Sequence, residues 1–176
     1  MKKYLIFTDL DGTLLDHENY SYGNNKKTIT SIINNENDVI FNTSKTFSES
    51  INLLKKLNLT NMPFSTENGA LLYFPKNRFK KIKNSSDYGK YWKIRIAKLS
   101  SKSWHQFLLK KQKKFKLLIA QDLPTKILKK YTNLDNTSKM LNREASQIIL
   151  WEDTLSNLRK FKNCLLYTSP SPRDGW

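Results

Sequence analysis

The chain has 176 residues, a mass of 20.7 kDa and a formal net charge of +16 at pH 7. This length fits one domain, or one domain with part of a second, and it excludes two complete domains of usual size. The hydrophobic fraction of 38% can bury a core, which excludes global disorder, and no apolar run approaches the roughly 18 residues that span a bilayer.

The N-terminal part of the chain alternates predicted strands and helices. Apolar runs and apolar positions at helical spacing predict strands over 4–7, 38–41 and 70–74 and helices over 26–35 and 46–57. Thr46 or Ser48 can cap the start of the second helix. This alternation is typical of a doubly wound α/β sheet.

The composition becomes basic at Pro75, where we place a domain boundary. The second part carries helices predicted over 104–114 and 124–131, a strand within 143–151, and a segment, 91–97, that is either helix or strand. We therefore expect a first domain over 1–74, a second over 75–163 and a tail over 164–176. The tail resembles a translated sequencing adaptor, and we expect it to be non-native. The single cysteine, Cys164, excludes an internal disulfide and favours a reducing, cytoplasmic setting.

The excess charge is concentrated in one region. Residues 75–130 hold 18 basic side chains against only Asp87 and Asp122, while the other residues are balanced. This pattern can attract a polyanion, either a phosphorylated metabolite or nucleic acid. A solvated basic face explains it equally well, because lysines outnumber arginines by 26 to 5.

Two carboxylates, Asp9 and Asp11, follow the first predicted strand and precede Gly12. In an open α/β sheet, ligands bind beyond the carboxyl ends of the strands, where this turn projects. Paired anionic side chains are costly unless a cation or proton is shared, which predicts a bound Mg²⁺ with oxygen ligands. One carboxylate can then attack phosphorus while its neighbour acts as general acid and base.

Two other interpretations apply to this turn. An Asp-x-Asp-Gly sequence can belong to a calcium loop, but Phe7 then occupies the first ligand position and a strand-like run replaces the entering helix. A plain surface turn is the second alternative, although it needs no acidic pair directly after a buried strand.

The segment 7–16, Phe-Thr-Asp-Leu-Asp-Gly-Thr-Leu-Leu-Asp, resembles the first motif of the haloacid dehalogenase superfamily of phosphatases. The resemblance implies a Rossmann-like core of partial parallel sheet with an inserted α+β cap. It implies that Asp9 is the nucleophile, that Asp11 is the general acid/base, and that both bind Mg²⁺. Thr43 matches the hydroxyl of the second motif, and Ser44 and Lys45 follow it as substrate contacts.

Within the superfamily, the chain is most similar to the mannosyl-3-phosphoglycerate phosphatase family. Similar segments lie at 16–22, 43–46, 63–70 and 143–151. The resemblance implies substrate contacts from Asn68, Gly69, Arg143 and Ser146 and a small phosphorylated sugar acid as substrate, which suits a basic cap.

The sequence also departs from that family. Gln147 and Ile148 stand where the family usually has Glu-Pro, and nothing after Trp151 resembles the later lysine and acidic loop of the superfamily. We therefore expect a fragment with little turnover of its own. Another sugar-phosphate phosphatase, such as a sucrose-phosphatase, is the nearest alternative function, and a basic nucleic-acid-binding module is the alternative from another class.

Overall fold

The computed structural model describes residues 3–10, 13–15, 23, 25–35, 37–132 and 137–168. The chain divides into two compact units. The first comprises Met1–Ser100 with Ser138–Ser146, and the second comprises Ser101–Thr137 with Gln147–Trp176. Within the described ranges, no helix has both the length and the apolar character needed to cross a membrane.

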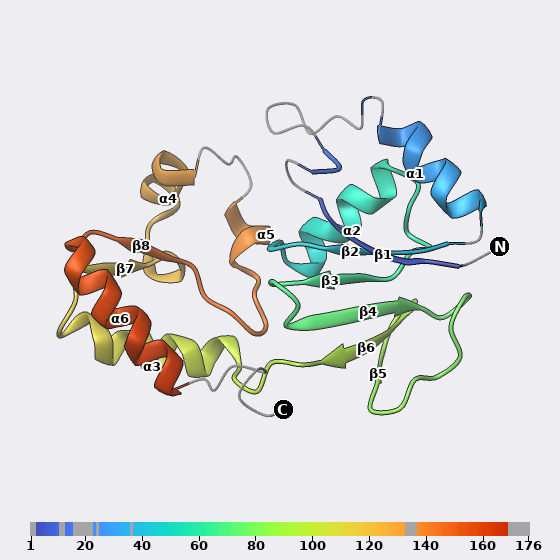
Figure 1. Ribbon diagram of the computed structural model, residues 1–176. Coiled ribbons are helices and arrows are strands. Elements are labelled where there is room, and N and C mark those ends of the chain that lie inside the picture. Colours follow the sequence, from blue (N-terminus) through green and yellow to red (C-terminus); the bar gives the residue numbers. More distant parts are fainter. Residues whose placement is uncertain are drawn as a thin grey trace. The chain divides into compact units, whose positions relative to one another are not determined.

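A six-stranded mixed sheet forms the centre of the first unit (Figure 1). Its strands are β1 (Leu5–Asp9), β2 (Asp38–Asn42), β3 (Phe64–Thr66), β4 (Leu71–Pro75), β5 (Ser86–Tyr88) and β6 (Tyr91–Arg95), in the spatial order β1-β2-β3-β4-β6-β5. The first three strands are parallel, and the other pairings are antiparallel. The sheet with its intervening helices confirms the predicted α/β class.

Two helices cross between the parallel strands, α1 (Asn25–Asn34) and α2 (Phe47–Lys56). Because β1, β2 and β3 are neighbours in chain order, right-handed crossovers place both helices on one face of the sheet. Ile29 of α1 and Leu54 of α2 are buried in one apolar cluster with Val39 and Phe41 of β2. Around the ring of Phe47, the aromatic side chains of Phe64, Tyr73, Tyr88 and Tyr91 complete this core.

The start of α2 is fixed by a capping box. The hydroxyl of Thr46 accepts a hydrogen bond from the backbone N–H of Glu49, and the Glu49 carboxylate accepts one from the backbone N–H of Thr46 at 2.9 Å. Such a pair satisfies two of the N–H groups that a helix leaves open at its first turn. Of the two caps that the sequence allowed, Thr46 is the one used.

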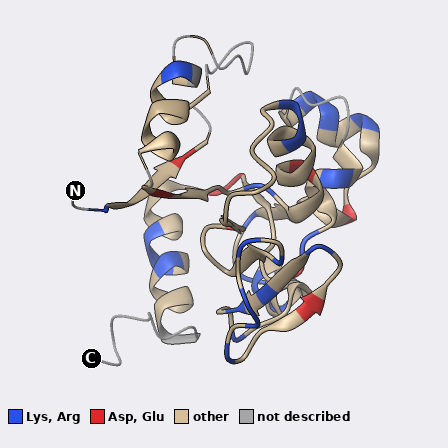
Figure 2. Ribbon diagram, turned by 90° about the vertical axis from the view of Figure 1, so that its right-hand side faces the viewer, with Lys and Arg blue, Asp and Glu red and all other residues tan. Residues whose placement is uncertain are grey.

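The basic segment that begins at Pro75 continues the sheet of the first unit, because β5 and β6 extend it beyond β4. The units therefore divide after Ser100, about 25 residues beyond the shift in composition at Pro75. Figure 2 shows Lys and Arg spread over many elements, with far fewer acidic residues. Among the described residues, three of these cations have acidic partners in the same unit, since Lys76 pairs with Asp87, Arg78 with Asp38 and Lys93 with Glu144.

The second unit is a small α+β structure. It contains a two-stranded antiparallel sheet of β7 (Leu117–Ile119) and β8 (Ile149–Trp151), with α3 (Ser101–Gln112), α4 (Thr125–Thr132) and α6 (Leu155–Thr168). Phe161 of α6 packs against Leu108, Phe115 and Leu117. Because α6 runs to Thr168, the first five residues of the predicted tail are helical, and 169–176 lie outside the described residues.

Candidate active site

The register between β1 and β2 places the predicted nucleophile. Asp9, the last residue of β1, pairs with Asn42, the last residue of the parallel strand β2. Thr43 follows directly, so Asp9 and Thr43 belong to the carboxyl ends of adjacent strands. Open α/β sheets bind ligands in this region. Asp9 is exposed, and one of its carboxylate oxygens accepts a hydrogen bond from the backbone N–H of Leu10 at 2.8 Å.

The loop after β2 is tightly hydrogen-bonded. Thr43 is 1% exposed, and its hydroxyl oxygen accepts a bond from the backbone N–H of Lys45 at 3.2 Å. Its backbone N–H donates to the carbonyl of Ser65 on β3 at 3.3 Å. The Thr43 hydroxyl is therefore held in place just after the carboxyl end of β2, while its own proton can be donated.

A second loop, between β3 and β4, supports the first. The backbone N–H of Glu67 donates to the carbonyl of Lys45, and that of Asn68 donates to the carbonyl of Thr43, both at 3.0 Å. Glu67, Asn68 and Gly69 all have left-handed backbones, with φ of 52°, 59° and 85°. The predicted contacts Asn68 and Gly69 thus lie in a turn that holds the Thr43 loop through main-chain bonds.

The structure also brings Arg143 and Ser146 to this loop. One terminal nitrogen of Arg143, Nη1, donates to the carbonyl of Ser44 at 3.2 Å and to the hydroxyl of Ser146 at 2.9 Å. Burial lowers the pKa of the Arg143 guanidinium from its ordinary value, and the negative charges of Glu67 and Glu49 oppose that shift. Predicted substrate contacts that lie 99 residues apart in the chain, Ser44 and Arg143, are therefore neighbours.

Glu67 is a site residue that the sequence-based prediction does not include, although it names the next two residues, Asn68 and Gly69. Its side chain is buried, with the residue 3% exposed, and accepts three hydrogen bonds from the 144–146 segment. The available signal was an acid directly before Asn-Gly with no basic residue next to it in the sequence. A buried carboxylate requires such partners.

Of the two predicted metal ligands, Asp9 is described, and Asp11 lies outside the described residues together with Gly12. Among the described residues, no group of three or more His, Cys, Asp or Glu side chains comes together to hold a metal ion. The exposed carboxylate of Asp9 at the end of β1 is a hard oxygen donor of the type that Mg²⁺ prefers. Its chemistry fits that ion.

Gln147, where the sequence departs from the resembled family, belongs to the second unit. Its side-chain amide donates to the carbonyl and hydroxyl of Ser101 at 3.1 and 2.8 Å and to the side chain of Gln121 at 2.8 Å. In this chain, Gln147 therefore links its own segment to those of Ser101 and Gln121 by hydrogen bonds.

Relatives of known name share much of this sequence. The glucosyl-3-phosphoglycerate/mannosyl-3-phosphoglycerate phosphatase of Methanococcoides burtonii is 33% identical over 141 residues, which are 79% of this chain and 52% of the relative. The protein of the same name from Persephonella marina is 30% identical over 151 residues, covering 85% of this chain and 55% of the relative. The chain spans about half the length of these two curated relatives.

The fold has a counterpart among solved structures. The X-ray crystal structure of TM0651 from Thermotoga maritima superposes with a TM-score of 0.54 and 19% sequence identity, covering 96% of this chain and 62% of that one. Residues 6–168 match the family of haloacid dehalogenase-like hydrolases, a range that includes Asp9, Thr43 and Arg143. The chain belongs to the haloacid dehalogenase-like hydrolases.

Proposed function

We propose that the protein is a phosphatase that hydrolyses the phosphomonoester of mannosyl-3-phosphoglycerate or its glucosyl analogue. The observation that carries this proposal is the register of Asp9 with Asn42, the residue before Thr43, which puts Asp9 and Thr43 at the carboxyl ends of adjacent parallel strands in a chain of this hydrolase family. The names of the two curated relatives support the substrate class.

In the proposed reaction, a carboxylate oxygen of Asp9 attacks phosphorus and forms an aspartyl-phosphate, while the bond from phosphorus to the substrate's ester oxygen breaks. Asp11 gives its proton to the departing oxygen. It then takes a proton from water, which attacks phosphorus and breaks the bond to Asp9, so that inorganic phosphate is released and the carboxylate is restored. The Thr43 hydroxyl donates to a phosphoryl oxygen and orients the group.

We propose that Asp9 and Asp11 hold a Mg²⁺ ion, which when bound offsets the repulsion between the carboxylate and the phosphate. Ser44, Lys45, Asn68 and Gly69 are proposed to contact the substrate around the phosphoryl group. Arg143 and Ser146 are proposed to contact the phosphoglycerate moiety, where the Arg143 guanidinium can donate hydrogen bonds to its anionic groups.

The test is phosphate release from mannosyl- and glucosyl-3-phosphoglycerate by the full-length gene product with Mg²⁺. Asp9→Asn is expected to lower kcat by at least about a thousandfold, the scale of losing a nucleophile. The matched control is Asp87→Asn, the same chemical change at an exposed carboxylate that pairs with Lys76, and it is expected to retain turnover. Turnover by Asp9→Asn equal to that of the wild type would overturn the proposal.

Two further arms separate the alternatives. Faster release from sucrose phosphate than from either glycosyl-phosphoglycerate would reassign the substrate while keeping the chemistry. Retardation of labelled RNA or DNA that survives Asp9→Asn and weakens steeply with salt would favour a nucleic-acid-binding function for the basic region.

A further inference from the structure

The turn at Glu67 joins three segments that are far apart in the sequence. Its backbone bonds hold the Thr43–Lys45 loop, and its side chain holds the 144–146 segment. The Glu67 carboxylate accepts from the backbone N–H groups of Glu144 at 2.8 Å and Ala145 at 3.0 Å and from the hydroxyl of Ser146 at 2.6 Å. The three donor residues and Glu67 all belong to the same compact unit.

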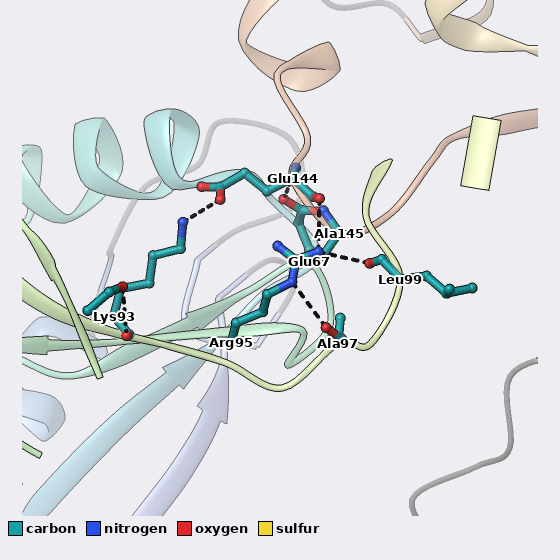
Figure 3. A network of polar contacts seen from close by, with 8 residues as sticks. Glu67, Lys93, Arg95, Ala97, Leu99, Glu144 and Ala145 are labelled. Atoms are coloured by element: carbon teal, nitrogen blue, oxygen red, sulfur yellow. Dashed lines mark hydrogen bonds and ion pairs between the residues drawn. The ribbon is translucent and has the colours of Figure 1, made fainter. Parts of the chain in front are cut away.

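Lys93 and Arg95 of β6 also contact the 144–146 segment, at Glu144. Figure 3 shows Lys93 directed at the Glu144 carboxylate and Arg95 beside Glu144, with dashed contacts from Arg95 to Ala97 and Leu99. The guanidinium of Arg95 donates to the carbonyl of Glu144 at 3.3 Å. Glu67 therefore completes a set of charged groups that fix both the backbone and the side chain of Glu144.

The position of Glu67 is unfavourable in free energy for two reasons, its backbone conformation and the burial of its charge. Its left-handed φ of 52° is followed by 59° at Asn68, a conformation that side chains with a Cβ rarely adopt. Its carboxylate is also removed from water, which is unfavourable unless hydrogen bonds replace the lost hydration. Backbone strain of this kind concentrates at functional sites.

Arg143 is held in place by the same set of contacts. It directly precedes the anchored segment, and its Nη1 shares the Ser146 hydroxyl with Glu67, since that hydroxyl accepts from Arg143 and donates to Glu67. The Nε–H of Arg143 is buried without a hydrogen-bond partner among the described residues. The guanidinium is thus held at the carbonyl of Ser44 by a chain of contacts that begins at Glu67.

We propose that Glu67 is a positioning residue that holds Arg143 against the Thr43–Ser44 loop, so that the guanidinium meets an anionic substrate group in a fixed orientation. This inference rests on the proposed phosphatase function for its kinetic consequence. Its structural part, the anchoring of the 144–146 segment, is independent of any activity.

The anchoring is tested by amide hydrogen exchange in this 176-residue chain. Glu67→Ala is expected to speed exchange at the backbone N–H groups of Glu144 and Ala145 by about tenfold or more, because each loses its acceptor, while exchange in β1 and β2 is unchanged. Glu67→Gln keeps one carbonyl oxygen and is expected to give a smaller change. Unchanged exchange at both amides in both variants would overturn the proposal.

The positioning role is tested by a double-mutant cycle in the full-length gene product. Glu67→Ala and Arg143→Ala are each expected to raise KM by about tenfold, the scale of one charge-assisted hydrogen bond, with a smaller effect on kcat. In the Arg143→Ala background, Glu67→Ala is expected to change KM by less than about twofold, because the two residues act through one contact. Additive effects, or a loss confined to kcat, would overturn the proposal.

The control variant is Ser50→Ala. It removes a buried hydrogen bond of the same unit, from the Ser50 hydroxyl to the carbonyl of Thr46 at 2.8 Å, and it is expected to leave KM unchanged. If Glu67→Ala fails to fold, the cycle is run with Glu67→Gln. If the proposed function is incorrect, the wild-type protein shows no turnover, but Glu67→Ala still speeds exchange at Glu144 and Ala145. If the role of Glu67 is incorrect, the wild-type protein turns over substrate, but Glu67→Ala leaves exchange at these amides unchanged.

Discussion

The carboxylate of Glu67 and the backbone N–H of Ala145 are hydrogen-bonded at 3.0 Å across 78 residues of chain. This bond and its two companions make Glu67 part of the stability of the first unit as well as of its site. Glu67→Ala leaves buried donors without an acceptor, and we expect it to lower the free energy of unfolding by about 2–4 kcal/mol. Urea denaturation measures the loss; a change within error would show that the bonds do not persist in solution.

The capping box of α2 gives a second prediction. Thr46→Ala removes the hydroxyl that accepts from the Glu49 N–H, and the expected loss of stability is about 1–2 kcal/mol. Ser48, the alternative cap allowed by the sequence, is the comparison: its hydroxyl contacts that of Thr46 at 3.2 Å but is not the acceptor of the Glu49 N–H, and Ser48→Ala is expected to cost about 0.5 kcal/mol. Equal losses for both variants in thermal or chemical denaturation would contradict the assignment of the cap.

Gly69 permits a prediction that separates backbone strain from crowding. A Cβ at this position meets no atom within 4 Å, so space is available, but the φ of 85° is unfavourable for any residue with a side chain. Gly69→Ala is therefore expected to cost about 1–2 kcal/mol of stability from the backbone alone. A neutral result in denaturation experiments would show that the turn relaxes without Gly.

The start of α6 supplies a prediction about pH. The Asp153 carboxylate accepts from the backbone N–H of Lys116, the side-chain amide of Asn157 and the backbone N–H of Thr154, and these bonds lower its pKa below the ordinary value. A lowered pKa in the folded state means that Asp153 contributes stability above its unfolded pKa of about 4 and loses it as pH falls through the folded pKa. NMR titration of the carboxyl carbon is expected to give a midpoint below 3.8, and an ordinary or raised midpoint would contradict these contacts.

Strong local patterns made parts of the fold predictable. Apolar runs predicted β1 and β2, and helical spacing predicted α2 to within one residue at each end. The three-residue strand β3 was not predicted, because its Phe64–Thr66 segment is too short to show a period and depends on pairing with β2 and β4. The same limit applies to β5 and β7, which are also three residues long and are defined by their pairing with β6 and β8.

The candidate site also contains residues that a local pattern predicts and a residue that depends on long-range contacts. The placement of Asp9 and Thr43 at one edge of the sheet could be predicted because each stands at the end of an apolar run, and it depends only on β1 and β2 being parallel neighbours. The role of Glu67 depends on contacts to residues 144–146, which no local pattern contains. The change to a basic composition at Pro75 did not coincide with the division into units, because β5 and β6 complete the first sheet before the chain leaves it.

The most direct test of the account is a search for the phosphoryl group on Asp9. The full-length gene product is mixed with mannosyl-3-phosphoglycerate and Mg²⁺, quenched in acid within a single turnover, and mapped by peptide mass spectrometry. Phosphate is expected on the peptide that contains Asp9 in the wild type, and none is expected in Asp9→Asn. Phosphate release at an undiminished rate by Asp9→Asn, with no modified peptide in the wild type, would contradict it.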